Sequence, residues 1–144
     1  MKKTKKITNK EKDRFAVKRA ARGKGKGLYA KSLIKRGEFI LEYVGKKIPT
    51  SVADELTTRY LFEIDKNWTI DGSHGGNVSR YINHSCDPNC ECEIDKGHIM
   101  IYAIKKIEPG QELSYDYGKE YFEEFIRPVG CLCGSPKCKQ PAKK

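Results

Sequence analysis

The chain has 144 residues and a formal net charge of +10; residues 1–26 alone sum to +10, whereas residues 27–136 sum to −4. This length excludes two ordinary domains, and the lack of an apolar run of ~20 residues excludes a membrane span. The basic opening lacks the apolar stretch of a signal peptide, so we expect an intracellular protein that is not secreted and contacts no membrane.

The N-terminal elements are predicted to be an arm and short strands. Residues 1–13 are polar and lysine-rich, which predicts a flexible basic arm. Phe15 and Val17 alternate with charged residues, a glycine-rich stretch follows, and residues 28–30 resume the apolar pattern. This pattern predicts two strands around a glycine loop. Residues 39–44 predict a further strand.

The segment that follows is predicted to be a short helix. Pro49 and Ser51 open it, and it extends to about Arg59. Asp54 lies three residues after Ser51, which is the spacing of a capping box.

The middle of the chain is predicted to be β-structure. Residues 60–64 and 68–70 have the composition of strands. Residues 90–95 and 98–103 alternate around Lys96-Gly97, which predicts a hairpin.

The C-terminal part is predicted to contain a turn, a strand and a little helix. A turn is expected at residues 108–110, a strand over 112–115 and one or two helical turns over 119–125. The fold class is therefore mostly β with short helices. We expect one domain over residues 14–126 and a cysteine-containing segment with a basic tail over 127–144.

Six cysteines without an export signal favour metal binding or reduced thiols over disulfides. Cys131, Cys133 and Cys138, with Gly and Pro between them, could place three thiolates around one ion, but structural zinc takes four ligands. Three disulfides and three unpaired thiols in a tail are the alternatives. The candidates for a fourth ligand are Cys86, Cys90 and Cys92.

Three other segments are ambiguous when each is taken alone. The Asn83-His84 pair is typical of a polar loop. Alternate glycines in residues 23–27 would let a ligand approach the backbone, although no nucleotide-binding fingerprint is present. Tyr115 and Tyr117 share one face of a predicted strand, where aromatic residues are usually core.

Taken in order, the segments GKGLYA, EYVG, YLFEID, GNVSRYINHSCDPNC, ELSYDYG and CLCGSPKC resemble the SET-domain protein-lysine methyltransferases. The resemblance extends from about Phe15 to Cys138, and NHSCDPN followed by YDYG is highly specific. It implies small sheets around a pseudoknot, with a C-terminal post-SET zinc loop. Sequence rules alone would not propose such threading, which is rare. The implied cofactors are S-adenosylmethionine and a structural zinc ion.

The resemblance also assigns roles to single residues. Tyr117 and Tyr115 are the implied catalytic residues, with Tyr117 nearest the chemistry, and Leu132 would cover the adenine. The implied zinc ligands are Cys86, Cys131, Cys133 and Cys138. The implied lining of the lysine channel is Tyr43, Phe62, Tyr115 and Tyr117. The implied cofactor-binding residues are Lys24, Gly25, Lys26, Gly27, Tyr60, Arg80, Asn83, His84 and Leu132.

The implied reaction transfers a methyl group to a neutral lysine amine. Free lysine has a pKa of about 10.4, but an aromatic channel and an adjoining sulfonium charge both disfavour the ammonium form. No general base is expected, because Asp116 should point away from the tyrosine face. A phenol at Tyr115 would occupy room for a further methyl group, so we expect mainly mono- or dimethyl-lysine.

The acidic balance of residues 27–136 suits a lysine-bearing basic protein, such as a histone or histone-like tail, bound by strand addition. The basic arm predicts either nucleic-acid contact or a solubilising tail, and both stay open. We expect no cysteine-rich pre-SET segment of the kind found in longer family members, and the arm or a homodimer partner could substitute for it. Localisation would be nuclear, on chromatin, in a eukaryote or an infected host, and cytoplasmic otherwise. The alternative function is a catalytically inactive, zinc-stabilised module that binds basic peptides or nucleic acid.

Overall fold

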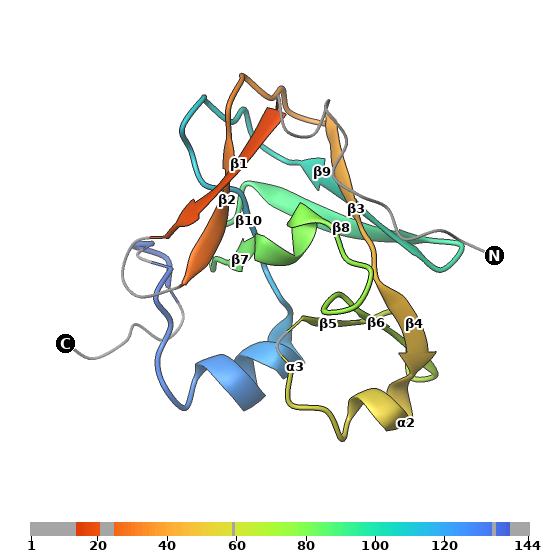
Figure 1. The fold of residues 1–144 in the computed structure, drawn as a ribbon. Coiled ribbons are helices and arrows are strands. Elements are labelled where there is room, and N and C mark those ends of the chain that lie inside the picture. The colour runs from red at the N-terminus through yellow and green to blue at the C-terminus, as the bar shows by residue number, and fades with distance from the viewer. Residues whose placement is uncertain (1–13, 21–24, 59, 134, 139–144) are drawn as a thin grey trace.

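The computed structural model describes residues 14–20, 25–58, 60–133 and 135–138. Within these ranges, short strands form four small sheets and the helices are short (Figure 1). The fold class expected from the sequence, mostly β with short helices, is confirmed. The elements are β1 (Phe15–Arg19), β2 (Lys26–Ala30), β3 (Phe39–Tyr43), β4 (Lys46–Pro49), α2 (Thr50–Ala53), β5 (Leu61–Glu63), β6 (Trp68–Asp71), η2 (Val78–Tyr81), β7 (Asn83–His84), β8 (Cys90–Asp95), β9 (His98–Ala103), β10 (Ser114–Tyr115), α3 (Lys119–Tyr121) and η3 (Phe122–Ile126).

The first sheet is the antiparallel pair β1–β2, in which Phe15 lies opposite Ala30. Phe15 and Leu28 are buried, whereas Val17 is exposed. The two strands predicted around the glycine loop are therefore confirmed. Lys24, in that loop, lies outside the described residues, as does the predicted arm over 1–13.

The sheet β3-β9-β8 contributes much of the core. Its β8–β9 hairpin has the predicted boundaries, and the turn residues Lys96 and Gly97 have φ angles of 51° and 81°. Two successive left-handed residues are what a tight type I′ turn requires. Alternate residues of β9, including Ile99 and Ile101, are fully buried, so the alternation in the sequence determines which face packs inward.

The sheet β4-β6-β5 has β6 at its centre and β5 at one edge. Phe62 of β5 lies opposite Ile70 of β6. The strands predicted over residues 60–64 and 68–70 are confirmed, although β5 is one residue shorter at each end. Because β5 is an edge strand, another extended segment could pair with it.

The helix predicted after Pro49 is present but ends well before residue 59, and its predicted capping box is wrong. Only α2 is helical; Pro49 is its N-cap, and no side chain caps it. Ser51 lies inside the helix rather than at its cap, and the Thr50 hydroxyl instead bonds to the Asp65 carbonyl oxygen and Thr69 Oγ1, both at 3.0 Å. Residues 54–57 are exposed, so no packing prolongs this single turn. Arg59 lies outside the described residues.

The fourth sheet joins two segments that are distant in sequence. β7 and β10 pair in parallel, with His84 opposite Tyr115. β10 is shorter than the strand predicted over residues 112–115, because Glu112 forms a separate bridge with Tyr29 of β2. This pairing brings the NHSCDPN and YDYG segments side by side.

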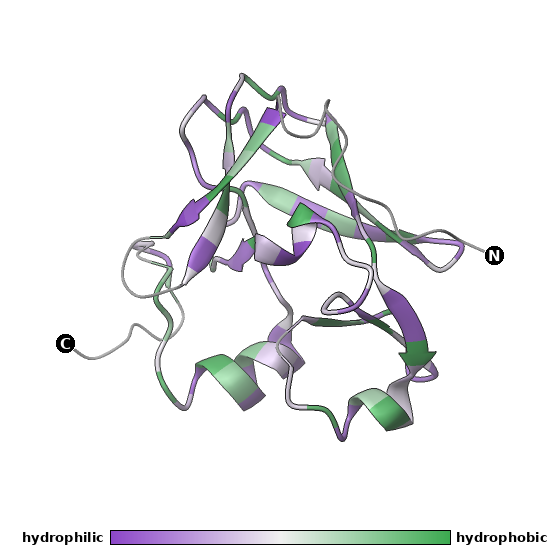
Figure 2. Cartoon of the chain, in the orientation of Figure 1, coloured by the Kyte–Doolittle hydropathy of each residue, from purple (hydrophilic) through white to green (hydrophobic). Residues whose placement is uncertain are grey.

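Helical structure over Lys119–Ile126 confirms the turns predicted over 119–125, in the form of α3 followed by the π-helical η3. Phe122 anchors this segment and is 1% exposed. Figure 2 shows the local hydropathy: β3 is largely apolar, whereas β4 begins polar at its two lysines and ends apolar at Ile48.

Candidate active site

Four aromatic side chains from separate parts of the chain form one continuous row. The ring of Phe62 lies 5.3 Å from that of Tyr43 and 5.9 Å from that of Tyr115. Tyr115 in turn lies 4.9 Å from Tyr117. The structure therefore brings together the four residues that the resemblance assigned to a lysine channel, and their role in a channel stays a prediction.

Hydrogen bonds fix the two ends of this aromatic row. The Tyr43 hydroxyl donates to the carbonyl oxygen of Tyr60 at 2.8 Å, and the Tyr117 hydroxyl donates to the carbonyl oxygen of Ile82. Burial raises the pKa of Tyr43 and of Tyr115 above the ordinary phenol value. The row therefore offers neutral phenols in a desolvated setting, which disfavours an ammonium group and can orient an amine.

Asp116 lies beside this row without joining it. Its side chain is partly exposed, and its Oδ1 accepts a hydrogen bond from the Gly118 backbone amide at 2.8 Å. That the site has no dedicated base stays a prediction.

His84 connects the aromatic row to the cysteines. The backbone amide of Tyr117 donates to His84 Nδ1 at 3.0 Å, so that nitrogen is an acceptor. The other ring nitrogen, Nε2, lies 3.5 Å from the Sγ of Cys86. The His84 ring also packs against those of Tyr117 and Phe122, at 5.5 Å from each.

Tyr117 also lines a pocket. At one end Arg80 lies between the rings of Tyr60 and Tyr81, at 5.3 and 5.0 Å from their centroids. Its guanidinium also donates to the Tyr81 hydroxyl at 3.0 Å. Lys26 lies 5.8 Å from the Tyr81 ring centroid, so this end carries two cations and suits an anionic group.

Most of the predicted cofactor-binding residues line this pocket. Gly25 and Gly27 are not among its lining residues, and Lys24 lies outside the described ones. Gly27 is buried, and a Cβ built on it would lie 2.6 Å from Glu112 Oε2. The close neighbour of Gly27 is therefore a side chain of the protein. The predicted residues that do line the pocket are Lys26, Tyr60, Arg80, Asn83, His84 and Leu132.

Sequence reasoning missed the apolar end of the pocket. Tyr121, Phe125 and Val129 line it and are spaced four residues apart, so they share one side of the helical segment and the turn after it. The rings continue the aromatic row: Tyr117 to Tyr121 is 5.0 Å, and Tyr121 to Phe125 is 4.9 Å. Phe125 and Val129 are 56% and 78% exposed. The helical spacing was the signal that could have found them.

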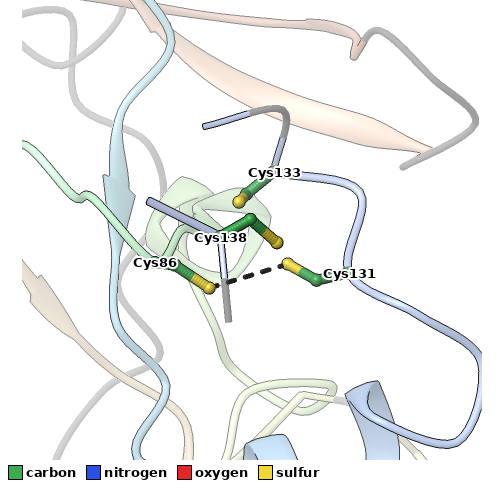
Figure 3. A group of neighbouring side chains, drawn as sticks. All are labelled: Cys86, Cys131, Cys133 and Cys138. Carbon is green, nitrogen blue, oxygen red and sulfur yellow. Dashed lines mark hydrogen bonds between the residues drawn. The ribbon is translucent and has the colours of Figure 1, made fainter. Parts of the chain in front are cut away.

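Four cysteine side chains converge where the C-terminal segment meets the core. The sulfur atoms of Cys86, Cys131, Cys133 and Cys138 all lie within 4.8 Å of one another (Figure 3), and those of Cys86 and Cys131 are 4.0 Å apart. Zn–S bonds of about 2.3 Å in a tetrahedron separate sulfurs by roughly 3.8 Å. The arrangement therefore fits one tetrahedral zinc ion with a closed ligand shell.

The remaining two cysteines lie in β8, away from this group. Cys90 is 1% exposed, and Cys92 packs against the core. Burial raises the pKa of both thiols to about 12, so they are neutral at physiological pH. Of the three candidates for the fourth ligand, these two therefore pack in or against the core, and Cys86 lies with the C-terminal cysteines.

An ion pair lies beside the four-cysteine group. Asp87 Oδ1 accepts a hydrogen bond from Lys105 Nζ at 3.0 Å and lies 4.0 Å from Lys137 Nζ. The hydrogen bond from Lys105 lowers the pKa of Asp87. Lys137 precedes Cys138, so the pair adds a weak link between the C-terminal segment and the core.

A sequence profile of the SET domain matches residues 25–118. The chain belongs to the SET domain family. The match contains Tyr43, Phe62, Tyr115 and Tyr117 and the pocket residues from Lys26 to His84, and it ends before Tyr121 and the C-terminal cysteines. The cysteine group lies at the position expected of the post-SET zinc motif.

Curated relatives of this SET domain are much longer proteins. It is 44% identical over 126 residues to the "Histone-lysine N-methyltransferase, H3 lysine-4 specific" of Emericella nidulans, covering 78% of this chain and 10% of that protein. The Saccharomyces cerevisiae protein of the same name is 41% identical over 126 residues, covering 78% and 12%. "Histone-lysine N-methyltransferase trithorax" of Drosophila virilis is 37% identical over 128 residues, covering 81% and 3%. The chain thus spans about a tenth or less of each relative.

A solved structure supports the same fold. Arabidopsis thaliana SUVH6, crystallised in complex with SAM, superposes with a TM-score of 0.77 at 30% identity, covering 88% of this chain and 32% of that one. Within the described residues, no helix is long and apolar enough to cross a membrane.

Proposed function

We propose that this SET domain is an S-adenosylmethionine-dependent methyltransferase that acts on lysine side chains of a basic, histone-type protein. The observation that carries the proposal is the position of Tyr117, which belongs both to the aromatic row and to the pocket lining. A methyl donor in the pocket and an amine in the row would meet at this residue. The names of the relatives and the ligand of SUVH6 support the same reaction.

The pocket residues fit S-adenosylmethionine. Lys26 and Arg80 suit its carboxylate, and the apolar end with Phe125 and Leu132 suits its adenine. When bound, S-adenosylmethionine supplies a methyl group activated by a sulfonium charge. The sulfurs of the four-cysteine group fit zinc, and four protein ligands leave no open coordination position, so its role would be structural.

The aromatic row would prepare the lysine amine. Its neutral phenols and Phe62 exclude water, which disfavours the ammonium form and so lowers the pKa of an entering lysine. The Tyr117 hydroxyl donates its hydrogen bond to the Ile82 carbonyl oxygen, so the hydroxyl oxygen can accept a hydrogen bond from the amine. Holding the amine in line is then the main contribution of the protein.

A basic segment of the substrate suits the surroundings of this row. Residues 27–136 carry 17 acidic and 13 basic side chains, and the edge strand β5, which supplies Phe62, can accept an extended peptide. We further propose that the product is mainly mono- or dimethyl-lysine, because the hydroxyl of the buried Tyr115, or a water held by it, would take room beside Tyr117. Such an enzyme would act on chromatin proteins.

Isothermal titration with S-adenosylmethionine separates this proposal from a non-catalytic module. The full chain is then incubated with core histones and S-adenosylmethionine, and lysine methylation is read by mass spectrometry. The enzyme should bind the cofactor and methylate lysine, and Tyr117→Phe should methylate far more slowly. Tyr102→Phe, on the far side of the sheet β3-β9-β8, is the matched control and should resemble the parent. No cofactor binding together with retained peptide binding would favour the non-catalytic module.

A further inference from the structure

Asn83 has both of its side-chain N–H bonds committed to acceptors of the protein. Its Nδ2 donates to the carbonyl oxygen of Lys26 at 3.0 Å and to Oε2 of Glu112 at 2.8 Å. A carbonyl oxygen and a carboxylate accept hydrogen bonds and do not donate them. The Asn83 amide therefore has one group left for a ligand, its oxygen Oδ1.

The packing around Glu112 shows that its place is closely defined. A Cβ at Gly27 would lie 2.6 Å from Glu112 Oε2, 3.1 Å from its carboxyl carbon and 3.2 Å from the Cβ of Ala20. Glu112 is half-buried, and its own carbonyl oxygen accepts a hydrogen bond from Asn89 Nδ2 at 2.9 Å. The backbone of β2 therefore passes close over the carboxylate, and a side chain at Gly27 would force the Glu112 carboxylate to shift.

We propose that Glu112 is a positioning residue that fixes the Asn83 amide, so that Asn83 presents its oxygen to a hydrogen-bond donor of the ligand in the pocket. The inference rests on the proposed function for the identity of that ligand, S-adenosylmethionine. The donors that this cofactor offers are its amino group and its ribose hydroxyls. The family resemblance assigns Asn83 to the cofactor but gives Glu112 no part.

The orientation of the Asn83 side-chain amide follows from the energetic cost of the flipped orientation. If the Asn83 amide turned over, its oxygen would face both Glu112 Oε2 and the Lys26 carbonyl, and three acceptors would meet without a proton. Without Glu112, one N–H of Asn83 loses its partner and the amide is held by Lys26 alone. Hydrogen bonds to charged groups contribute about 1.5–3 kcal/mol, which corresponds to roughly a tenfold or larger change in affinity.

The test compares Glu112→Ala with Glu112→Gln, which keeps an oxygen that can accept from Asn83. We expect Glu112→Ala to weaken S-adenosylmethionine binding roughly tenfold or more, and Glu112→Gln to stay within about threefold of the parent. At saturating cofactor, kcat of Glu112→Ala should change by less than about threefold, because Glu112 acts on cofactor binding through Asn83. Gly27→Ala should act like Glu112→Ala, and its effect should shrink in the Glu112→Ala background. Glu93→Ala, exposed on β8, is the matched control.

A nuclear magnetic resonance readout makes the result independent of catalysis. The side-chain amide of Asn83, assigned through Asn83→Ala, should exchange slowly in the parent and in Glu112→Gln, and faster in Glu112→Ala. Unchanged cofactor affinity and amide exchange in Glu112→Ala would overturn the inference, as would equal losses in the Ala and Gln variants. If the parent bound no cofactor, the proposed function would fail, while the amide exchange would still decide the part played by Glu112.

Discussion

Tyr117 and His84 are joined by a hydrogen bond of 3.0 Å from the backbone amide of Tyr117 to the ring nitrogen Nδ1 of His84. The other ring nitrogen of His84 lies 3.5 Å from the sulfur of Cys86. One imidazole thus connects the four-cysteine group to the end of the aromatic row. The geometry of Tyr117 should therefore depend on the order of the four-cysteine group.

Cys86→Ser should remove bound zinc and weaken S-adenosylmethionine binding together. The physical reason is that Cys131 and Leu132 both line the pocket, and the four-cysteine group holds them there. Zinc content is measured by mass spectrometry of the metal and cofactor affinity by calorimetry. Cys90→Ser, at a buried site outside the group, is the control and should keep its zinc. Zinc kept by Cys86→Ser but lost by Cys90→Ser would refute the assignment.

Tyr115→Phe should shift the products toward higher methylation states while activity persists. Tyr115 is buried and lies 4.9 Å from Tyr117, so its hydroxyl, or a water held by it, would fill space that another methyl group needs. Mass spectrometry of one histone peptide reads the product distribution. Abundant trimethyl-lysine from the unmodified enzyme would contradict this prediction.

Tyr117→Phe should instead reduce the rate at every methylation state. The loss should be roughly 100-fold, as is typical when one positioned hydrogen-bonding group is removed from a reaction site. Single-turnover kinetics on unmethylated, monomethylated and dimethylated peptides test this. A loss confined to one methylation state would show that Tyr117 controls product rather than rate.

The buried phenols should make folding sensitive to high pH. Burial raises the pKa of Tyr43 and Tyr115 in the folded state. Above about pH 10 the unfolded chain has lost these protons while the folded chain keeps them, so the free energy of unfolding falls as pH rises. Each phenol lowers the free energy of unfolding by up to about 1.4 kcal/mol per pH unit in that range, and it causes no pH dependence well below pH 10. Denaturant unfolding should show a shallower decline in Tyr43→Phe, and equal slopes would disprove the effect.

The salt dependence of DNA binding tests whether the basic arm contacts nucleic acid. Residues 1–12 carry six lysines and one acid and lie outside the described residues. If the arm grips nucleic acid, DNA affinity should fall steeply with salt, and removal of residues 2–12 should flatten that dependence. Methylation of a short peptide should survive the deletion. A DNA interaction that is absent or insensitive to salt would leave only the solubilising role.

Local patterns predicted the positions of the strands well, but they overestimated the length of the helix after Pro49. The β8–β9 hairpin depends on alternation and on two left-handed turn residues, and both are properties of neighbouring residues. The predicted helix after Pro49 had a matching capping pattern, but α2 ends at Ala53 because the side chains of residues 54–57 are exposed and bury no face against the core. Most helical stability comes from such packing, which the capping pattern does not report.

The sequence by itself determined the family, through motifs in a fixed order, and the hairpin, through turn chemistry. From the residues alone it left three candidates for the fourth ligand and no partner for Gly27. Tertiary structure placed Cys86 beside the C-terminal cysteines, assembled the aromatic row from three sheets, and set Glu112 beneath Gly27. The physical reason is range: turns and alternation are decided within a few residues, whereas ligand sets and pocket walls depend on side chains brought together by long-range packing.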